Sequence, residues 1–581
     1  MKTRLPKSLL ALVAYAAIST AQADVINPTT IWVEGGEMEL GSKAIEGQYT
    51  LDVKDTANTA TITKDVESAS ALYVRDGKLI IGGGQGEAAH NTVKINTANG
   101  ASDQLDHDDY PTILNVAGKN ATLVIDNATV TSDTETSMSV GGPDGNGTLI
   151  IQNGGKYLGN KQNFFFIGYQ SGKEELGAQN IYDKYLVHAT TNNTNDDIDK
   201  VENRFEGLYS ENKVENREYG RGVVTVQGEG SLMETGMYGM HMGEGEVNIL
   251  DGAVFNSNSY ALGEKDKHGV TRQGGATSLG YVKGSTSIVN VKNGGVWNIY
   301  GQLHTGNIGV NSKTIINVEH GTVNLLDKRG AFLGLGGKSV NDYLPNGSTT
   351  EFILGEGAKL NVSEEMYIGY VASAKLTVAK TAEINDFGNK NDSGGALDRL
   401  IVEAAGTIEN AGKIDMLIDL RGGVVTMADG AKAADLTASA GTLAILGDVV
   451  FNGDIMLSDT GFLFTDGATI DLQGHDFSFD GGAVTIVVNA ATPAVAMFSL
   501  EDEEMLASYG ITFKNAGTVT GFEDDIEVTI ATMDADGQIT ETGAKYILKS
   551  SDVTVQSIPE PTTATLSLLA LAGLAMRRRR K

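Results

Sequence analysis

A recurring unit built around glycine constrains the fold of this chain more than any other feature. The unit consists of alternating apolar residues, a polar residue, a glycine, a small residue and a second alternating run. Alternation with a period of two gives each strand one apolar face, and the glycine supplies the positive φ of a tight turn. The copies that we identify are Leu72–Ile81, Ile150–Gly159, Val247–Ser257, Ile288–Ile299, Ile315–Leu326, Phe352–Ser363 and Phe462–Gly474. The sequence therefore predicts short β-strands throughout.

A second signal, an apolar residue followed by glycine, lies 11 to 15 residues after each turn glycine. Two whole periods, Gly230 to Gly252 and Gly294 to Gly321, are 22 and 27 residues long. The near-constant spacing indicates a coil with two corners that stacks on its neighbours. The turn glycines are Gly154, Gly230, Gly252, Gly294, Gly321 and Gly357, and the predicted corners are Ile167-Gly168, Met242-Gly243, Leu262-Gly263, Ile308-Gly309, Leu333-Gly334 and Ile368-Gly369.

These spacings predict an all-β fold, a β-solenoid of the parallel β-helix type over residues 24–489. From Ala490 the repeat fades, and we expect residues 490–556 to form a small, separate β-rich cap. The pattern over Leu72–Gly482 resembles the β-strand repeats of autotransporter passenger domains, which implies the same architecture. The alternative is a set of β-sandwich domains, whose strands also alternate and turn on glycine.

The segment 172–221 interrupts the repeat. It is dense in Asn, Asp, Glu and Lys and carries no sustained apolar period. We expect it to project from one coil as a loop. Such an insertion serves either as a binding element or as a solvated loop without a role of its own.

The C-terminus consists of three parts in a fixed order: Pro559-Glu560-Pro561, the apolar run Ala564–Met576, and the basic residues Arg577–Lys581. The two prolines hold the chain extended. The apolar run makes about 20 Å of helix, short of the ~30 Å hydrocarbon core of a bilayer. The basic residues are expected to stay on the cytoplasmic side. The sequence therefore predicts a C-terminal membrane-targeting helix over a short span.

This order of parts resembles the PEP-CTERM sorting signal over about Ile558–Lys581. The resemblance implies that an exosortase-type membrane protease cuts near Pro559, Glu560 and Pro561 after transient membrane insertion. The cluster of Arg577, Arg578, Arg579 and Arg580 matches the basic end of that signal. The alternative is an ordinary anchor that stays uncut.

The N-terminus agrees with export. Three basic residues precede the apolar run Leu9–Ile18, and Ala21 and Ala23 supply the small residues of a cleavage site. This is the pattern of a secretory signal peptide over residues 1–23, so we expect the mature chain to begin at Asp24.

Charge and cysteine content narrow the possible partners. The formal net charge is −30, and the two terminal segments hold eight of the positive charges, so the body is more acidic still. Such a surface repels nucleic acid, and we predict no nucleic-acid partner. The chain has no cysteine, which excludes disulfides, thiolate nucleophiles and cysteine-bound zinc.

Catalytic and metal-binding chemistry has only weak candidates, and we predict no cofactor beyond weakly bound calcium. The acidic cluster Asp106–Asp109, the glycine-rich segment Gly141–Leu149 and the runs Glu501–Glu504 and Glu523–Asp525 offer carboxylates, but each also fits an exposed loop. Turn aspartates are expected to bond to their own backbone. The turn aspartates that we single out are Asp126, Asp251 and Asp466.

We therefore predict a non-enzymatic, secreted structural or adhesive protein of the cell surface or extracellular matrix of a Gram-negative bacterium. Its expected partners are the processing protease, the secretion machinery and exopolysaccharide or other surface glycans. The alternative is a carbohydrate-active enzyme, a polysaccharide lyase or hydrolase, on the same scaffold.

Overall fold

The fold is taken from a computed structural model that describes most of the chain between Thr30 and Ser557. The predicted signal peptide, the predicted membrane-targeting helix and nearly all of the predicted insertion and sorting signal lie outside the described residues. The described residues are 30–36, 48–54, 59–62, 66–69, 71–74, 77–82, 90–95, 112–118, 121–132, 137–141, 145–159, 164–168, 220–236, 239–259, 275–282, 284–306, 311–327, 330–338, 343–387, 398–489, 509–534 and 539–557.

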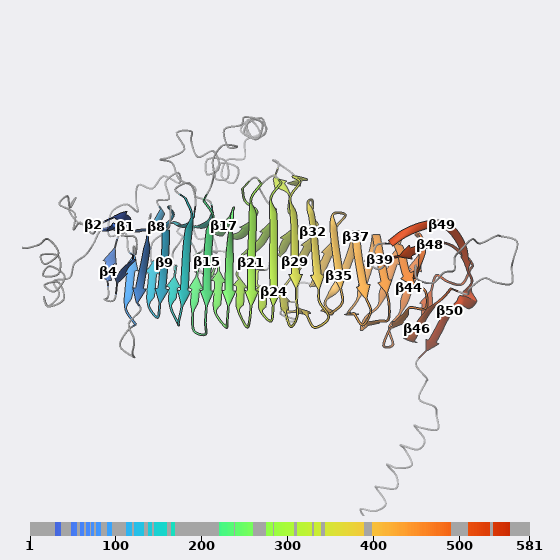
Figure 1. The fold of residues 1–581 in the computed structure, drawn as a ribbon. Coiled ribbons are helices and arrows are strands. Elements are labelled where there is room, and N and C mark those ends of the chain that lie inside the picture. The colour runs from blue at the N-terminus through green and yellow to red at the C-terminus, as the bar shows by residue number, and fades with distance from the viewer. Residues whose placement is uncertain are drawn as a thin grey trace, which may run out of the picture.

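The strands form one elongated stack of coils, with the N-terminal strands at one end and the C-terminal strands at the other (Figure 1). A typical coil contributes one strand to each of three parallel ladders, which we number in chain order. In one such coil, β18 (Gly245–Leu250) lies in ladder 1, β19 (Val254–Ser257) in ladder 2 and β20 (Ala276–Leu279) in ladder 3. This arrangement is that of a β-solenoid, as the repeat predicts.

Ladder 1 runs for most of the length of the stack. Its further strands are β3 (Thr59–Ile62), β6 (Lys78–Gly82), β9 (Ala121–Asp126), β12 (Gly147–Gln152), β15 (Gly222–Gln227), β21 (Thr286–Lys292), β24 (Lys313–Glu319), β29 (Thr349–Leu354), β32 (Ser373–Val378), β35 (Gly406–Asn410), β42 (Gly461–Thr465), β45 (Val484–Asn489) and β48 (Ile526–Met533).

Ladder 2 is a separate sheet of sixteen strands. Its further strands are β4 (Val66–Ala69), β7 (Thr92–Ile95), β10 (Thr129–Ser132), β13 (Lys156–Leu158), β16 (Leu232–Glu234), β22 (Val296–Ile299), β25 (Thr322–Leu325), β30 (Lys359–Val362), β33 (Glu383–Asp386), β36 (Lys413–Asp415), β38 (Lys432–Ala433), β40 (Val449–Phe451), β43 (Thr469–Asp471), β46 (Ile511–Ala516) and β50 (Val553–Ser557).

Ladder 3 completes the coil. Its further strands are β2 (Gln48–Lys54), β1 (Thr30–Gly36), β5 (Ala71–Val74), β8 (Thr112–Val116), β11 (Ser137–Val140), β14 (Phe164–Ile167), β17 (Gly239–Met242), β23 (Gln302–Thr305), β26 (Ala331–Leu333), β31 (Glu365–Ile368), β34 (Arg399–Val402), β41 (Ile455–Ser458), β44 (Phe477–Asp480) and β47 (Val519–Thr520). The short strands β27 (Gly337–Lys338) and β28 (Tyr343–Leu344) pair only with each other.

Parallel pairing decides between the two predicted folds. Among the described strands, only β27 with β28 and β48 with β49 (Ile539–Leu548) pair antiparallel. A β-sandwich is built from antiparallel sheets, so that alternative is wrong. The all-β prediction with parallel stacked coils is confirmed, and the one helical element in the described part of the chain is the 3-10 turn η2 (Ser550–Asp552). No helix there is long and apolar enough to cross a bilayer.

The core consists of columns of apolar side chains that repeat from coil to coil. In ladder 2, Phe255, Trp297, Val323, Leu360 and Ile384 are paired in order and almost fully buried. Each such side chain contributes about 1.5–3 kcal/mol when it leaves water. The buried Trp297 also satisfies its indole N–H, which donates to Ser257 Oγ at 3.3 Å.

Two kinds of corner shape each coil. Between ladders 1 and 2, Asp251-Gly252 and Asn293-Gly294 both have positive φ at both positions, which is a type I′ turn, as the repeat predicts. After ladder 3, glycines with positive φ reverse the chain direction. They include the predicted Gly334 and Gly369, but Leu262-Gly263 and Ile308-Gly309 lie outside the described residues. In their coils the corner glycines are Gly280 and Gly306 instead.

Toward the C-terminus the coils shorten and two ladders merge. Thr407 pairs with Val424, Val424 with Thr442 and Thr442 with Gly461, so these coils take 17 to 19 residues. Here β37 (Leu417–Ala428) and β39 (Leu436–Leu446) each run through the corner from ladder 3 into ladder 1. The shortest coils lack room for a separate connection between these two ladders.

The predicted separate cap is an extension of the same stack. Strands β46, β47 and β48 pair parallel with β43, β44 and β45, so the three ladders continue past the expected boundary at residue 490. Only β49 departs from the pattern, because it folds back against β48. A cluster of phenylalanines fills the core at this end, with Phe477 and Phe513 4.6 Å apart between ring centres.

The corner glycines yield a first prediction. Gly369 has a φ of 69°, and a Cβ there would collide with the backbone of Ala405 and Gly406. Gly430 has a φ of 79° but no atom within 4 Å of such a Cβ. Gly430→Ala should lower the free energy of unfolding by about 1–2 kcal/mol, the cost of a left-handed backbone.

Gly369→Ala should cost about 1–3 kcal/mol more, because neighbouring backbone must also move. Thermal and urea unfolding of both variants beside the wild type measures the difference. Equal losses would contradict the tight contact between these coils at the corner.

Candidate functional site

Nearly every site residue predicted from the sequence lies outside the described residues. This holds for Ala21, Ala23, Asp24, Pro559, Glu560, Pro561, Arg577, Arg578, Arg579 and Arg580, and also for Asp106–Asp109 and Glu501–Glu504. Of the glycine-rich segment Gly141–Leu149, the described part leads into β12 and pairs with Gly118. The run Glu523–Asp525 is an exposed turn. Candidate sites in the described residues therefore have to be built from the coils themselves.

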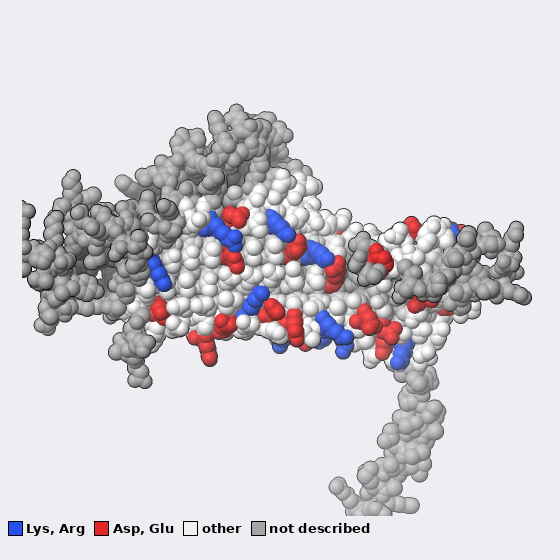
Figure 2. All heavy atoms as spheres, viewed as in Figure 1, with Lys and Arg blue, Asp and Glu red and all other residues white. Residues whose placement is uncertain are grey.

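Charged side chains follow the outer faces of the stack in rows (Figure 2). Ion pairs join successive coils on ladder 1, with Arg221 to Glu246 at 2.6 Å and Lys375 to Glu409 at 2.7 Å. Lys313 and Glu351 pair at 3.2 Å in the same way. These pairs are largely exposed, so each contributes little to stability. They define a solvated surface that alternates in sign along the stack.

An asparagine ladder runs along the outer face of ladder 2. Each side-chain amide donates from Nδ2 to Oδ1 of the asparagine in the preceding coil, at distances between 2.6 and 3.1 Å. Asn256 at one end donates to Glu234 Oε1 at 3.0 Å, and Asp415 faces Asn385 at the other end. The five members are Asn256, Asn298, Asn324, Asn361 and Asn385, all partly exposed. We call this row the ladder 2 amide row.

A shorter amide row lies on ladder 1. Asn290 donates to Asn248 at 2.9 Å, and Asn317 donates to Asn290 at 3.0 Å. Asn290 also donates to Glu246 at 3.1 Å, and the ion pair of Lys292 with Glu319 lies on the same two strands. This row therefore lies among charged groups, in contrast to most of the ladder 2 amide row.

Aspartates at the corners bind the next coil. The carboxylate of Asp435 accepts the backbone N–H of Asp454 at 2.9 Å, and Asp454 accepts that of Asp476 at 3.0 Å. The turn aspartates Asp126, Asp251 and Asp466 were expected to bond to their own backbone. They accept instead from Asn153, Asn293 and Gly510 of the following coil. The stacking geometry brings a donor of the next coil closer than the turn's own amides.

Aromatic and histidine side chains share one outer column of ladder 3. His304 lies 5.7 Å from Phe332, and Phe332 stacks on Tyr367 at 4.8 Å with an interplanar angle of 5°. His241 contacts Tyr281 edge-on at 4.4 Å. Burial, with a smaller contribution from nearby His304, lowers the pKa of His241 to about 3. His241 is therefore neutral at physiological pH.

An ion-pair network crosses three coils beside this column. Arg399 donates to Glu365 Oε1 at 2.6 Å and to Asp419 Oδ2 at 2.9 Å, and Arg421 donates to Asp419 at 2.7 Å. The hydroxyl of Tyr367 donates to Glu365 Oε2 at 2.7 Å. Burial and the bond to Glu365 raise the pKa of Tyr367 to about 12. Burial opposes the ionised form of Glu365, but the bonds from Tyr367 and Arg399 outweigh it and lower its pKa. The network is internally satisfied, which indicates a role in holding coils together.

Three carboxyl groups interact at a corner between ladders 2 and 3. Partial burial is the largest cause that raises the pKa of Asp398, to about 7, followed by a hydrogen bond with Asp386 and the charges of Asp386 and Glu364. One carboxylic acid that stays protonated near neutral pH beside ionised carboxylates is the arrangement of a general acid. This is the strongest catalytic candidate among the described residues.

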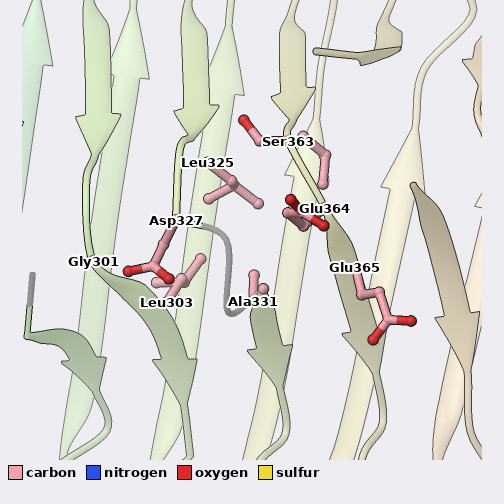
Figure 3. Close-up of a pocket in the computed structure, with 10 residues that line it drawn as sticks. Gly301, Leu303, Leu325, Asp327, Ala331, Ser363, Glu364 and Glu365 are labelled. Atoms are coloured by element: carbon pink, nitrogen blue, oxygen red, sulfur yellow. The ribbon is translucent and has the colours of Figure 1, made fainter. Parts of the chain in front are cut away.

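A shallow hollow of about 200 Å³ opens near this corner, where Asp327 and Glu364 come from successive coils (Figure 3). Leu303, Leu325 and Ala331 supply apolar lining between them. Glu365, which belongs to the ion-pair network, also lines it. The hollow places carboxylates beside an apolar surface but is small compared with ordinary ligand pockets.

No three carboxylate or histidine groups in the described part of the chain are arranged to hold a metal ion. The predicted weak calcium binding stays a prediction, because most of the acidic segments that suggested it lie outside those residues.

Both the amide row and the acidic corner escaped sequence reasoning. For the amide row a signal was present, since Asn256, Asn298 and Asn361 each lie four residues after a turn glycine. The corner carried no such signal, because Asp386 and Asp398 meet only through the course of an irregular connection.

Comparisons with known proteins do not assign this chain to a family. No family model matches the sequence, and no curated protein is significantly similar to it. Function has to be argued from the geometry above.

Asp398 yields a prediction on pH dependence. Its pKa is 3.8 when unperturbed and about 7 in the fold, so between these values the folded chain keeps a proton that the unfolded chain releases. Stability from this group is therefore complete below about pH 4 and is lost as the pH rises through 7. Asp398→Asn should flatten that part of the stability profile and raise the unfolding temperature above pH 7.

Thermal unfolding between pH 4 and pH 8 measures this effect. The control is Asp480→Asn, which removes one exposed carboxylate at the end of β44. If the two variants gave the same change of slope, the coupling of Asp398 to Asp386 and Glu364 would be refuted.

Proposed function

We propose that this protein is a secreted structural or adhesive β-solenoid of the bacterial cell surface or exopolysaccharide matrix. The observation that carries the proposal is the unbroken pairing of ladder 1, from β3 to β48, within one stack. Such a stack is stiff and presents the same kind of outer face over many coils. A long regular surface suits contact with polymers or neighbouring chains.

The charge pattern supports an extracellular, solvated role. The chain has 74 Asp and Glu against 44 Lys and Arg, which keeps copies apart in solution. Stability without any cysteine comes from packing, backbone pairing and ion pairs between coils. These features agree with export as a cysteine-free, self-supporting domain.

Export and sorting rest on the two terminal segments. We propose that residues 1–23 direct secretion and that the segment around Pro559, Glu560 and Pro561 is cut by an exosortase-type protease. The supporting observations are the sequence patterns described above, with Arg577–Arg580 as the cytoplasmic stop. The delivered protein would then comprise the whole stack without either apolar segment.

Sorting yields a direct prediction. Replacement of Arg577–Arg580 by Ala should leave the full-length precursor in the membrane fraction, because the basic stop is lost. Cell fractionation and the intact mass of the exported protein measure this. The matched control replaces four basic residues of the stack, Lys292, Lys313, Lys375 and Lys413, by Ala. Normal yield of the shortened form from the Arg variant would overturn the sorting proposal.

The second candidate is a glycan-cleaving enzyme, and the acidic corner is the observation that favours it. In that case Asp398 would act as the general acid, with Asp386 or Glu364 as the ionised partner. These groups lie on successive coils, as a bound polysaccharide would require.

A turnover experiment separates the two functions. Incubation with a polysaccharide panel, followed by assays for reducing and unsaturated ends, should show no sustained turnover if the protein is structural. Turnover that Asp398→Asn reduces by about 10²-fold or more, the usual effect of losing a general acid, would establish the enzyme instead.

A further inference from the structure

We propose that the ladder 2 amide row is a binding strip for an uncharged, linear polysaccharide that lies along the axis of the stack. The inference rests on the proposed function and deepens it, because it names the face and the class of glycan. It depends on three features of the row: hydrogen-bonding capacity, lack of charge and a regular repeat.

The amide row keeps hydrogen-bonding capacity for a ligand. A side-chain amide has two N–H donors and two lone pairs on its oxygen. Within the row, Asn298 uses one donor toward Asn256 and one lone pair for Asn324. Asn324 and Asn361 are bonded in the same way. Each therefore retains one donor and one acceptor, and all the amides point in the same direction.

The strip lacks charge where the rest of the molecule is strongly acidic. On β19, β22 and β25 the outer positions beside the amides are Val254, Val296 and Thr322. Charge appears only toward the ends of the row, at Glu234 on one side and from Lys359 onward on the other. Apolar methyl groups next to amides match the C–H faces and hydroxyl groups of an uncharged sugar. An acidic polysaccharide would be repelled by a chain of net charge −30.

The repeat of the row favours a polymer over a compact ligand. Strands β19, β22, β25, β30 and β33 pair without a shift in register. Neighbouring strands lie about 4.8 Å apart, so the five amides span about 19 Å. The buried Phe255 and Trp297 beneath them hold the strip rigid. A linear chain that runs along the axis contacts successive amides in turn.

Direct binding measurements test the proposal. Calorimetric titration of the purified protein with soluble β-glucan, galactomannan and dextran should show binding to at least one of them, with little dependence on salt. Alginate, an acidic polysaccharide, should not bind. With oligosaccharides of the bound type, affinity should rise with chain length up to about 19 Å and then level off.

Matched variants locate the strip. Asn298→Thr with Asn324→Thr should weaken binding about tenfold, because two hydrogen-bonding positions are lost. The control is Asn290→Thr with Asn317→Thr in the amide row of ladder 1, which makes the same chemical change among charged groups. It should leave affinity within about twofold. Thermal unfolding of both double variants should show similar losses.

A third variant guards against a folding defect. Val296→Lys leaves every amide bond of the row in place and is compatible with the strand, since Lys359 holds the equivalent outer position in β30. It should also reduce binding, because it covers the uncharged strip.

Several outcomes would overturn the inference. These are equal loss of binding in the two double variants, binding of alginate alone, no binding to any polysaccharide, or an oligomer that the ladder 2 variants dissociate without any effect on glycan. Fractionation of the exported protein is independent of this strip. Normal delivery to the surface without glycan binding would therefore reject the strip and leave the proposed function intact.

Discussion

Parallel backbone pairing between successive coils is the interaction on which the rest of this structure depends. Each coil alone exposes an apolar face that it cannot bury, so stability arises only when the next coil pairs in register. Register then decides the side chains as well. The column from Phe255 through Trp297 to Ile384 is apolar inside, and the column one residue away, from Asn256 to Asn385, carries the amides outside. A slip by one residue would exchange these two columns.

Side-chain contacts between coils follow the same rule. Asparagine donates to asparagine, aspartate accepts the backbone amide of the next coil, and Arg399 joins Glu365 to Asp419 across three coils. Each contact is modest, but all act along the axis, where the coils would otherwise separate. The same repetition produces long surface strips with a constant chemistry. Recognition of a polymer is the use that such a strip serves best.

Much of the architecture could be predicted from the sequence because the local signals are strong. Gly252 and Gly294 lie in the predicted turns, and the alternation around them names the buried residues correctly. The corners after ladder 3 were harder to assign. Glycine is so abundant that Leu262-Gly263 and Ile308-Gly309 fitted the spacing as well as the observed corners at Gly280 and Gly306. The expected separate cap after residue 490 was wrong, since β46 to β48 extend the ladders even though the repeat in their sequence is faint.

The sequence by itself determined the class of fold, the turn positions and the two terminal segments with their expected roles in export. All of these depend on short-range features, such as apolar alternation, the backbone freedom of glycine and charge beside an apolar run. Only the tertiary structure decided which residues of different coils meet, and so only it revealed the amide row and the corner of Glu364, Asp386 and Asp398. The reason is that coil lengths vary from 17 residues upward, so positions that are vertical neighbours have no fixed separation along the chain.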